Sequence, residues 1–320
     1  MTQDMRAMPP AFEWILTHQL PCALLAVLMF GIGLWFAGTT LSIPLLALNL
    51  LTPALFALIT LGGGMKFGVQ VAALAAVLIS LAARASLEPG LLLLTLYGLF
   101  PILAAASLNG PGGMSKSAQH LAIGLGAAML ASLLAGAAGQ DVTARVFVEQ
   151  GLSPLFNAMQ GQQNIDAELL NRIRHVTVSV FPGLMALSLW VVWWSNVLLA
   201  RNIAMYYGFF RGDTLPFNAL RLNSKVAYLF LALALASAMT QGTLQYLAIN
   251  TSLLIAGLLS VQGLAVVHTW LQARRMQLLA VLMYIVLLIQ PVMVLPFIVI
   301  GLFDIWFDYR RNITPANGGQ

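Results

Sequence analysis

The residues with the clearest chemical potential are uncharged polar and aromatic side chains inside long apolar runs. They are Trp190, Trp194, Asn196, Gln241, Gln245, Asn250 and Gln262. Amides hydrogen-bond and indole rings stack without carrying charge, so such a set could line a cavity for a small uncharged or planar solute. The same side chains could instead bridge helices, with the tryptophans in the aromatic belt at the membrane surface. Both interpretations fit the pattern.

A second pattern consists of small residues that recur every four positions, namely Gly124, Ala128, Ser132 and Gly136. Small residues on one face of a helix let a neighbouring helix approach closely, which is a main source of packing energy in lipid. This face predicts close contact either inside one bundle or with the helices of a partner protein.

Residues for catalysis or metal binding form no recognisable set. No two of His18, His175 and His268 have the spacing of metal ligands, and Cys22 is the only cysteine. A nucleophilic site needs a nucleophile with a base, and a metal site needs several ligands at suitable spacing. The sequence therefore predicts a protein that is not an enzyme and that holds no metal and no cofactor.

The elements that carry these residues follow from the scarcity of charge. Lys and Arg number 15 and Asp and Glu 10 among 320 residues, or 8% of the chain, and 60% of the residues are apolar. A soluble domain has about 25% charged residues, so this chain cannot cover a soluble surface. Runs without any charge, such as 14–65, 226–273 and 276–303, hold one or two stretches of the roughly 20 residues that cross a bilayer as a helix.

The fold class is therefore predicted as an all-α, polytopic transmembrane helical bundle of about 8–9 spans. The spans lie near residues 20–38, 41–62, 67–83, 89–108, 120–139, 176–199, 226–243, 249–271 and 276–303. They make one integral membrane domain over residues 1–320. It has an N-terminal tail at 1–19, an amphipathic interfacial segment at 140–175 and a C-terminal interfacial tail at 304–320.

The basic residues favour an N-terminus inside the cell. With nine spans, nine Lys and Arg lie on the inner side and six on the outer side. Gln290-Pro291 and Pro296 interrupt the last run, so it could instead be a broken helix that returns to its starting side. The count would then be eleven against four. The predicted location is the bacterial cytoplasmic (inner) membrane, where the partner is the lipid bilayer and not nucleic acid.

The most distinctive string is GLFDIWFDYRR, which begins at Gly301. Asp304, Asp308 and Arg311 share one side if the helix continues, and this spacing permits an ion pair between Asp308 and Arg311 at the membrane surface. An interfacial anchor is the simplest interpretation of this string.

This string, together with Val261-Gln262-Gly263-Leu264, resembles the YybS-like family of predicted bacterial membrane proteins, a domain-of-unknown-function family. The positions that match the family's pattern are Asn250, Gln262, Gly263, Gly301, Asp304, Asp308 and Arg310. The resemblance brings no activity with it. It implies a distant similarity to the substrate-capture subunits of energy-coupling-factor transporters and to MreD-like cell-shape proteins. A further partner would then be another membrane protein or an energising module.

Two functions follow as hypotheses. The first is capture or transport of a small uncharged or planar solute in a cavity among the later helices. The alternative is a non-transporting membrane scaffold or assembly factor, which would bind partner helices through the small-residue face.

Overall fold

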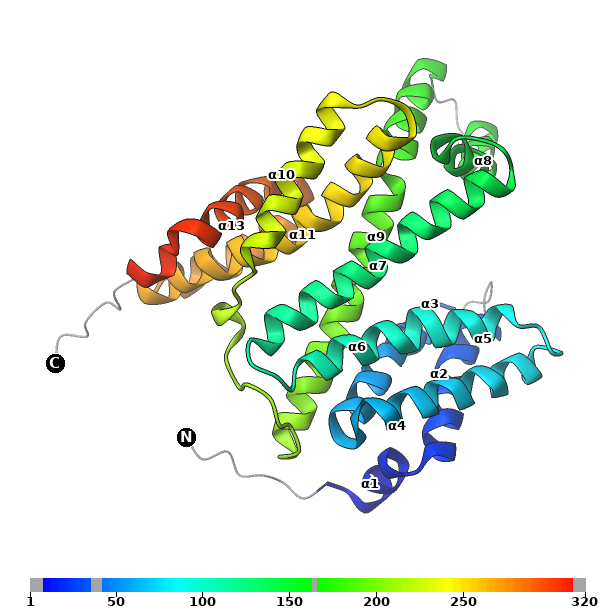
Figure 1. The fold of residues 1–320 in the computed structure, drawn as a ribbon, viewed down its shortest axis with the longest axis vertical. Helices are drawn as coiled ribbons and strands as arrows, with labels where there is room; N and C mark the ends of the chain where they lie inside the picture. Colours follow the sequence, from blue (N-terminus) through cyan, green and yellow to red (C-terminus); the bar gives the residue numbers. More distant parts are fainter. Residues whose placement is uncertain (1–7, 36–41, 163–165, 313–320) are drawn as a thin grey trace. The chain divides into compact units, whose positions relative to one another are not determined.

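The computed structural model describes residues 8–35, 42–162 and 166–312, and all regular secondary structure in these ranges is helical (Figure 1). This confirms the predicted all-α class. Within the described ranges, five helices are long and apolar enough to cross a membrane: Leu46–Ala82, Glu88–Ser107, Gly113–Gly139, Ala167–Tyr206 and Gly242–Ala273. Four shorter apolar helices accompany them, at Gln19–Ile32, Ser224–Met239, Gln277–Ile289 and Val292–Phe307. The predicted number of spans stays a prediction.

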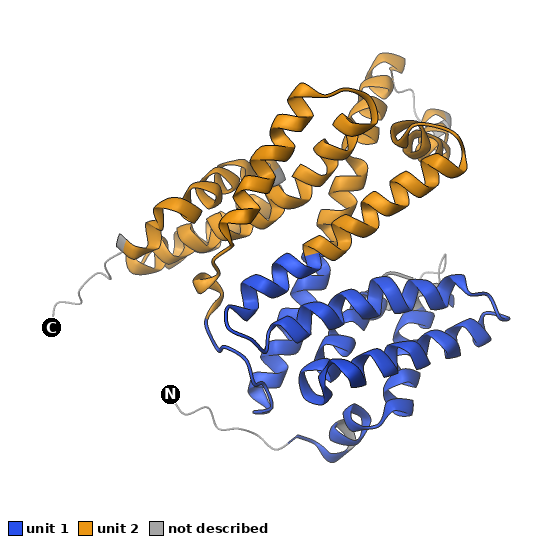
Figure 2. Cartoon of the chain, in the orientation of Figure 1, with its two compact units in different colours: residues 1–121, 190–215 blue, residues 122–189, 216–320 orange. Residues whose placement is uncertain are grey.

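The chain forms two compact units, shown in Figure 2. Unit 1 comprises residues 1–121 and 190–215, and unit 2 comprises residues 122–189 and 216–320. Two helices, α7 (Gly113–Gly139) and α9 (Ala167–Tyr206), contribute a stretch to each unit. The single membrane domain of the sequence analysis stays a prediction.

Unit 1 is built around a broken helix. Its elements are α1 (Pro10–Thr17), α2 (Gln19–Trp35), α3 (Ser42–Leu50), α4 (Thr52–Ala82), α5 (Glu88–Leu92), a π-helical stretch (Leu93–Leu99) and α6 (Phe100–Ser107). The α4 helix packs on α2 and α6, and Phe30, Phe56 and Ile59 are fully buried there. Gly64 interrupts α4 with φ +85°, a conformation that glycine adopts at no steric cost. The interruption lies between the predicted spans 41–62 and 67–83.

Unit 2 is built around α11 (Gly242–Ala273), against which the neighbouring helices pack. These include α8 (Ala144–Gln162), α10 (Ser224–Met239), α12 (Gln277–Ile289) and α13 (Leu295–Phe307). The α10 helix begins where the Asn223 side chain accepts a hydrogen bond from the backbone N–H of Lys225, a normal N-cap. The predicted segment 140–175 is helical over α8 and over the start of α9. Its position at the membrane surface stays a prediction.

A proline inside α9 accounts for two buried polar residues of α11. Pro182 lacks an N–H, so the carbonyl of Val178 loses its helical donor, and the hydroxyl of Tyr246 donates to it instead at 2.8 Å. The side chain of Asn250 bonds to both groups of the next pair along α9, the N–H of Gly183 and the carbonyl of Ser179. It accepts from the N–H of Gly183 at 2.8 Å and donates to the carbonyl of Ser179 at 3.0 Å.

Replacing Asn250 with leucine should therefore lower the free energy of unfolding by about 2–3 kcal/mol, because buried backbone groups of Gly183 and Ser179 lose their partners. Denaturant titration of the purified protein in mild detergent measures this. Thr251→Val is the matched control, because Thr251 donates only within its own helix. Equal stability of the two variants would contradict the assignment.

The last apolar run is a broken helix, as one of the two arrangements that the sequence left open requires. Its return to the starting side of the membrane stays a prediction. The helices α12 and α13 have 13 residues each and flank a short 3-10 turn at Pro291–Val294. Each is about 20 Å long, which is shorter than the roughly 30 Å of hydrocarbon in a bilayer. Gln290 is non-helical, with φ −127° and ψ 81°, and Pro291 cannot donate to the ladder.

The broken run brings the end of α13 back beside the end of α11. Gln262 of α11 hydrogen-bonds to Asp304 of α13. Later residues of the two segments, Trp270 after Gln262 and Tyr309 after Asp304, line one groove. The two helices therefore run in the same direction, as Figure 1 shows. Arg310 consequently lies at the same end of unit 2 as the C-terminus of α11.

Candidate functional site

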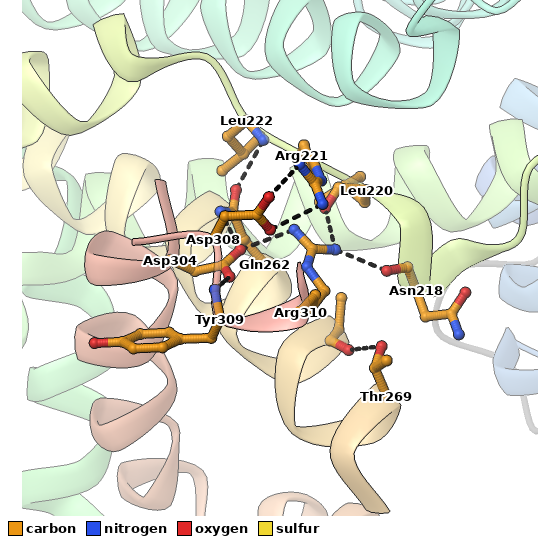
Figure 3. A network of polar contacts seen from close by, with 11 residues as sticks. Asn218, Leu220, Arg221, Leu222, Gln262, Thr269, Asp304, Asp308, Tyr309 and Arg310 are labelled. Atoms are coloured by element: carbon orange, nitrogen blue, oxygen red, sulfur yellow. Dashed lines mark hydrogen bonds and ion pairs between the residues drawn. The ribbon is translucent and has the colours of Figure 1, made fainter. Parts of the chain in front are cut away.

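Asp304 is the centre of a buried polar network at this end of unit 2 (Figure 3). Its side chain is 1% exposed and sits in the last turn of α13. One carboxylate oxygen accepts from Nε2 of Gln262 at 2.8 Å and from Nη2 of Arg310 at 2.8 Å. The other accepts from the backbone N–H of Tyr309 at 3.0 Å. Three donors therefore stabilise the buried negative charge.

Arg310 connects this carboxylate to the loop that precedes α10. Its Nη1 donates to the carbonyls of Asn218 and Leu220, both at 2.7 Å, and its side chain is 7% exposed. Gln262 adds a third attachment, because its Oε1 accepts from the N–H of Leu222 at 2.8 Å. Backbone groups that would otherwise be unpaired in this loop are thus bonded to α11 and to the end of α13.

A second ion pair lies further out. Arg221 makes two contacts of 2.8 Å with the carboxylate of Asp308, and the side chains are 59% and 32% exposed. The sequence permitted a pair between Asp308 and Arg311 on a continuous helix. The helix instead ends at Phe307, and Asp308 is left-handed with φ +45°, so its side chain meets the loop.

Two glycines allow the helices to approach closely enough for the network to form. A Cβ atom on Gly263 would overlap the carbonyl oxygen of Phe297, and one on Gly301 would overlap the carbonyl oxygen of Leu259. The backbones of α11 and α13 are therefore in direct contact, as small residues permit in membrane proteins. This contact places Gln262 beside Asp304.

The arrangement is suited to holding elements together. Each carboxylate faces one guanidinium, so the charges cancel pairwise, and the hydrogen bonds offset the cost of burying Asp304 and Arg310. Among the described residues, no three His, Cys, Asp or Glu side chains form a group that could hold a metal ion. We interpret the network as a clamp that ties the C-terminal helices to the loop.

Six positions of the motif thus lie together in the clamp: Gln262, Gly263, Gly301, Asp304, Asp308 and Arg310. Asn250 lies elsewhere on α11, where it bridges to α9. The sequence analysis missed the loop residues Asn218, Leu220 and Leu222. They contribute backbone groups, which leave no signature in side-chain type.

The residues predicted to line a solute cavity are distributed between the two units. In unit 1, Trp190 donates to the carbonyl of Ala118 and stacks on Trp194, and Asn196 donates to the carbonyl of Leu50. These hydrogen bonds join separate segments of the chain, as the helix-bridging interpretation expects. Binding of a solute by these residues stays a prediction.

In unit 2, Gln245 donates to the carbonyl of Ser237, while Gln241 is exposed at the start of α11. Asn250 and Gln262 are bonded as described above.

The small-residue face of α7 is only partly occupied. A Cβ on Gly136 would overlap the ring of Phe147, so this glycine packs against α8. Gly124 and Ala128 are half-buried and Ser132 is exposed. Docking of a partner on this face stays a prediction.

A cavity of about 300 Å³ lies in unit 1 at the break of α4. Its polar side chains are Glu13 and Thr17 of α1. The other walls come from residues on both sides of the break and from Phe209, and include Leu58, Ile59, Gly62, Gly63 and Phe67. The non-helical Gly64 directly follows Gly62 and Gly63 of the cavity wall. The sequence suggested no cavity here, because its walls come from three distant segments.

Comparison with known proteins finds one family. The family described as "Predicted membrane protein (DUF2232)" matches residues 23–305, which is most of the chain. No curated protein and no solved structure matches. The matched range contains both the cavity-forming break in α4 and the centre of the clamp.

Proposed function

The chain belongs to this family of predicted membrane proteins (DUF2232), and on that premise we propose that it captures a small uncharged or planar solute within the bacterial cytoplasmic membrane. The observation that carries the proposal is the cavity at the break of α4. The proposal keeps the solute class of the sequence hypothesis and moves the binding site to unit 1.

The cavity has the features of a small-molecule site. Its volume of about 300 Å³ is at the lower end of the range for ligand pockets, roughly 300–1,000 Å³. The phenyl rings of Phe67 and Phe209 suit a planar body, and the carboxylate of Glu13 suits a hydrogen-bond donor. Membrane transporters place substrates where a helix is interrupted, because backbone groups are freed there.

The basic residues of unit 2 indicate which end of this unit would face the cytoplasm. Arg221, Arg274, Arg275, Arg310 and Arg311 gather at the end of α11 and α13, in or beside the clamp. Basic residues next to membrane helices favour the cytoplasmic side. This end of unit 2 would therefore face the cytoplasm.

A scaffold role is the second candidate, and the exposed part of the α7 face favours it. Ser132 of this face is exposed, and so are Ala127, Ala131 and Ala135 in the neighbouring row of small residues, so a partner helix could approach α7 closely.

Filling the cavity tests solute capture. Gly62→Leu should place a side chain in the cavity, so that a planar probe can no longer bury its full apolar surface there. We expect the affinity for planar probes to fall at least about tenfold, which corresponds to about 1.4 kcal/mol of binding free energy. Indole, tryptamine and quinoline serve as probes, with calorimetric titration of the purified protein in lipid nanodiscs as the measurement.

Gly139→Leu is the matched control, because a Cβ at Gly139 meets nothing within 4 Å. It should bind the probes as the wild type does. If no probe binds the wild type, or if Gly62→Leu binds as tightly as the wild type, solute capture in this cavity is wrong.

A further inference from the structure

A groove on unit 2 combines an apolar and aromatic lining with an arginine at one end. It lies between α11 and α13, has a volume of about 520 Å³ and is lined by Val266, Val267, Trp270, Val299, Ile300, Phe303 and Tyr309. Trp270, Phe303 and Tyr309 are 41%, 43% and 44% exposed, so the groove is open to its surroundings. Apolar walls facing a bilayer are covered by hydrocarbon chains.

We propose that this groove binds an anionic phospholipid, with an acyl chain along the apolar walls and the phosphate at Arg274 and Arg311. Neither the family nor the solute cavity of unit 1 assigns this site. The proposal does not depend on solute capture.

The charged end of the groove is carried by Arg274. Its guanidinium carbon lies 4.8 Å from the ring centroid of Trp270, which itself lines the groove. A guanidinium held over an aromatic ring still has N–H groups that can reach an anion. The aromatic ring thus holds the cation at the end of the apolar wall.

Arg311 supplies a second cation two residues after Tyr309 of the groove. Both Arg274 and Arg311 are exposed, and among the described ion pairs neither one faces a carboxylate. Arg221 and Arg310 differ, because Asp308 and Asp304 neutralise them. Arg274, beside Trp270 of the groove, and Arg311, two residues after Tyr309, are therefore cations at this end of unit 2 that no described ion pair neutralises.

The aromatic residues fit a lipid as well. Trp and Tyr side chains prefer the level of the headgroups, and Trp270 and Tyr309 lie where the apolar walls meet the basic residues. Pockets with basic residues between membrane helices on the cytoplasmic side bind anionic headgroups. This matches the orientation inferred from the basic end of unit 2.

Lipid retention tests the proposal. The full chain is purified in mild detergent and mixed with equal amounts of phosphatidylglycerol and phosphatidylcholine of identical acyl chains, and bound lipids are counted by native mass spectrometry. The wild type should retain phosphatidylglycerol in preference. The double variant Arg274→Gln/Arg311→Gln should lose about tenfold or more of this preference, since each basic residue near the surface contributes several-fold.

Two further variants separate the charge from the groove. Val299→Trp should fill the groove and lower retention of both lipids. Arg172→Gln, an exposed arginine elsewhere in unit 2, should keep the preference of the wild type. Glycerol 3-phosphate, offered as a competitor, should not displace the lipid, because it lacks the acyl chains.

Several results would overturn the proposal. Equal retention of both lipids by the wild type means that the arginines do not select a headgroup. An unchanged preference in the double variant places the lipid elsewhere. Displacement by glycerol 3-phosphate indicates a phosphate site without a lipid groove, and retention of neither lipid, with a polypeptide bound instead, indicates a protein partner.

Discussion

Replacing Arg310 with alanine should lower the free energy of unfolding by about 3–5 kcal/mol, because it leaves the carboxylate of Asp304 buried without its cation. The side chain of Asp304 is 1% exposed, so water cannot replace the lost partner. The carbonyls of Asn218 and Leu220 lose their donor as well. Denaturant titration in detergent, followed by circular dichroism, gives the value.

An exposed pair provides the control for this prediction. Arg172 bonds to Glu168 with side chains 75% and 70% exposed, and Arg172→Ala should cost about 1 kcal/mol or less. The double variant Asp304→Leu/Arg310→Met should be more stable than Arg310→Ala, because no unpaired charge is left inside. If Arg310→Ala costs no more than Arg172→Ala, the clamp does not stabilise the fold.

Replacing Gly301 with valine should be comparably damaging, at about 3 kcal/mol or more, because the new side chain would overlap the carbonyl oxygen of Leu259. Backbone cannot rotate out of the way as a side chain can, so α11 and α13 must separate. The separation would also pull Asp304 away from Gln262. The thermal unfolding midpoint in detergent measures the loss.

Gly139→Val is the control for the steric argument, because Gly139 also belongs to an apolar helix but a Cβ there meets nothing within 4 Å. It should cost less than about 1 kcal/mol. Gly263→Ala should resemble Gly301→Val, since it meets the carbonyl of Phe297 across the same contact. If the Gly301→Val protein has the same thermal unfolding midpoint as the wild type, the backbones of α11 and α13 are not in contact as described.

The helical membrane class was predictable because it depends on composition and on the distribution of charge, which are local properties. The break at Gly64 falls between the predicted spans 41–62 and 67–83, where three successive glycines favour a turn. The break at Gln290-Pro291 was foreseen as one of two possibilities. Whether the chain crosses or returns there depends on contacts with α11, which local sequence does not contain.

The contacts of the clamp could not be predicted from the sequence. The resemblance selected Asp304 and Arg310, yet nothing in the string GLFDIWFDYRR indicates that their partners lie in the loop before α10. Asp304 and Gln262 are 42 residues apart, and Arg310 and Asn218 are 92 apart. The predicted pair of Asp308 with Arg311 assumed a continuous helix, which ends instead at Phe307.

The burial of two charged residues was also not anticipated from the sequence. The predicted spans stopped short of Arg201 and Asp304, but α9 and α13 continue past them, and both residues are buried. Arg201 donates to the carbonyls of Asp213 and Leu215. These acceptors are backbone groups of a loop, so their position could not be inferred from residue type.

The short length of α12 and α13 determines the order in which the chain can assemble. Neither is long enough to enter the bilayer as an independent span, and the non-helical backbone between them needs protein beside it. The surface of α11 supplies that cover and is synthesised first. The hairpin of α12 and α13 therefore needs α11 in place before it can pack, and the clamp can close only when α11 and the loop before α10 are both present.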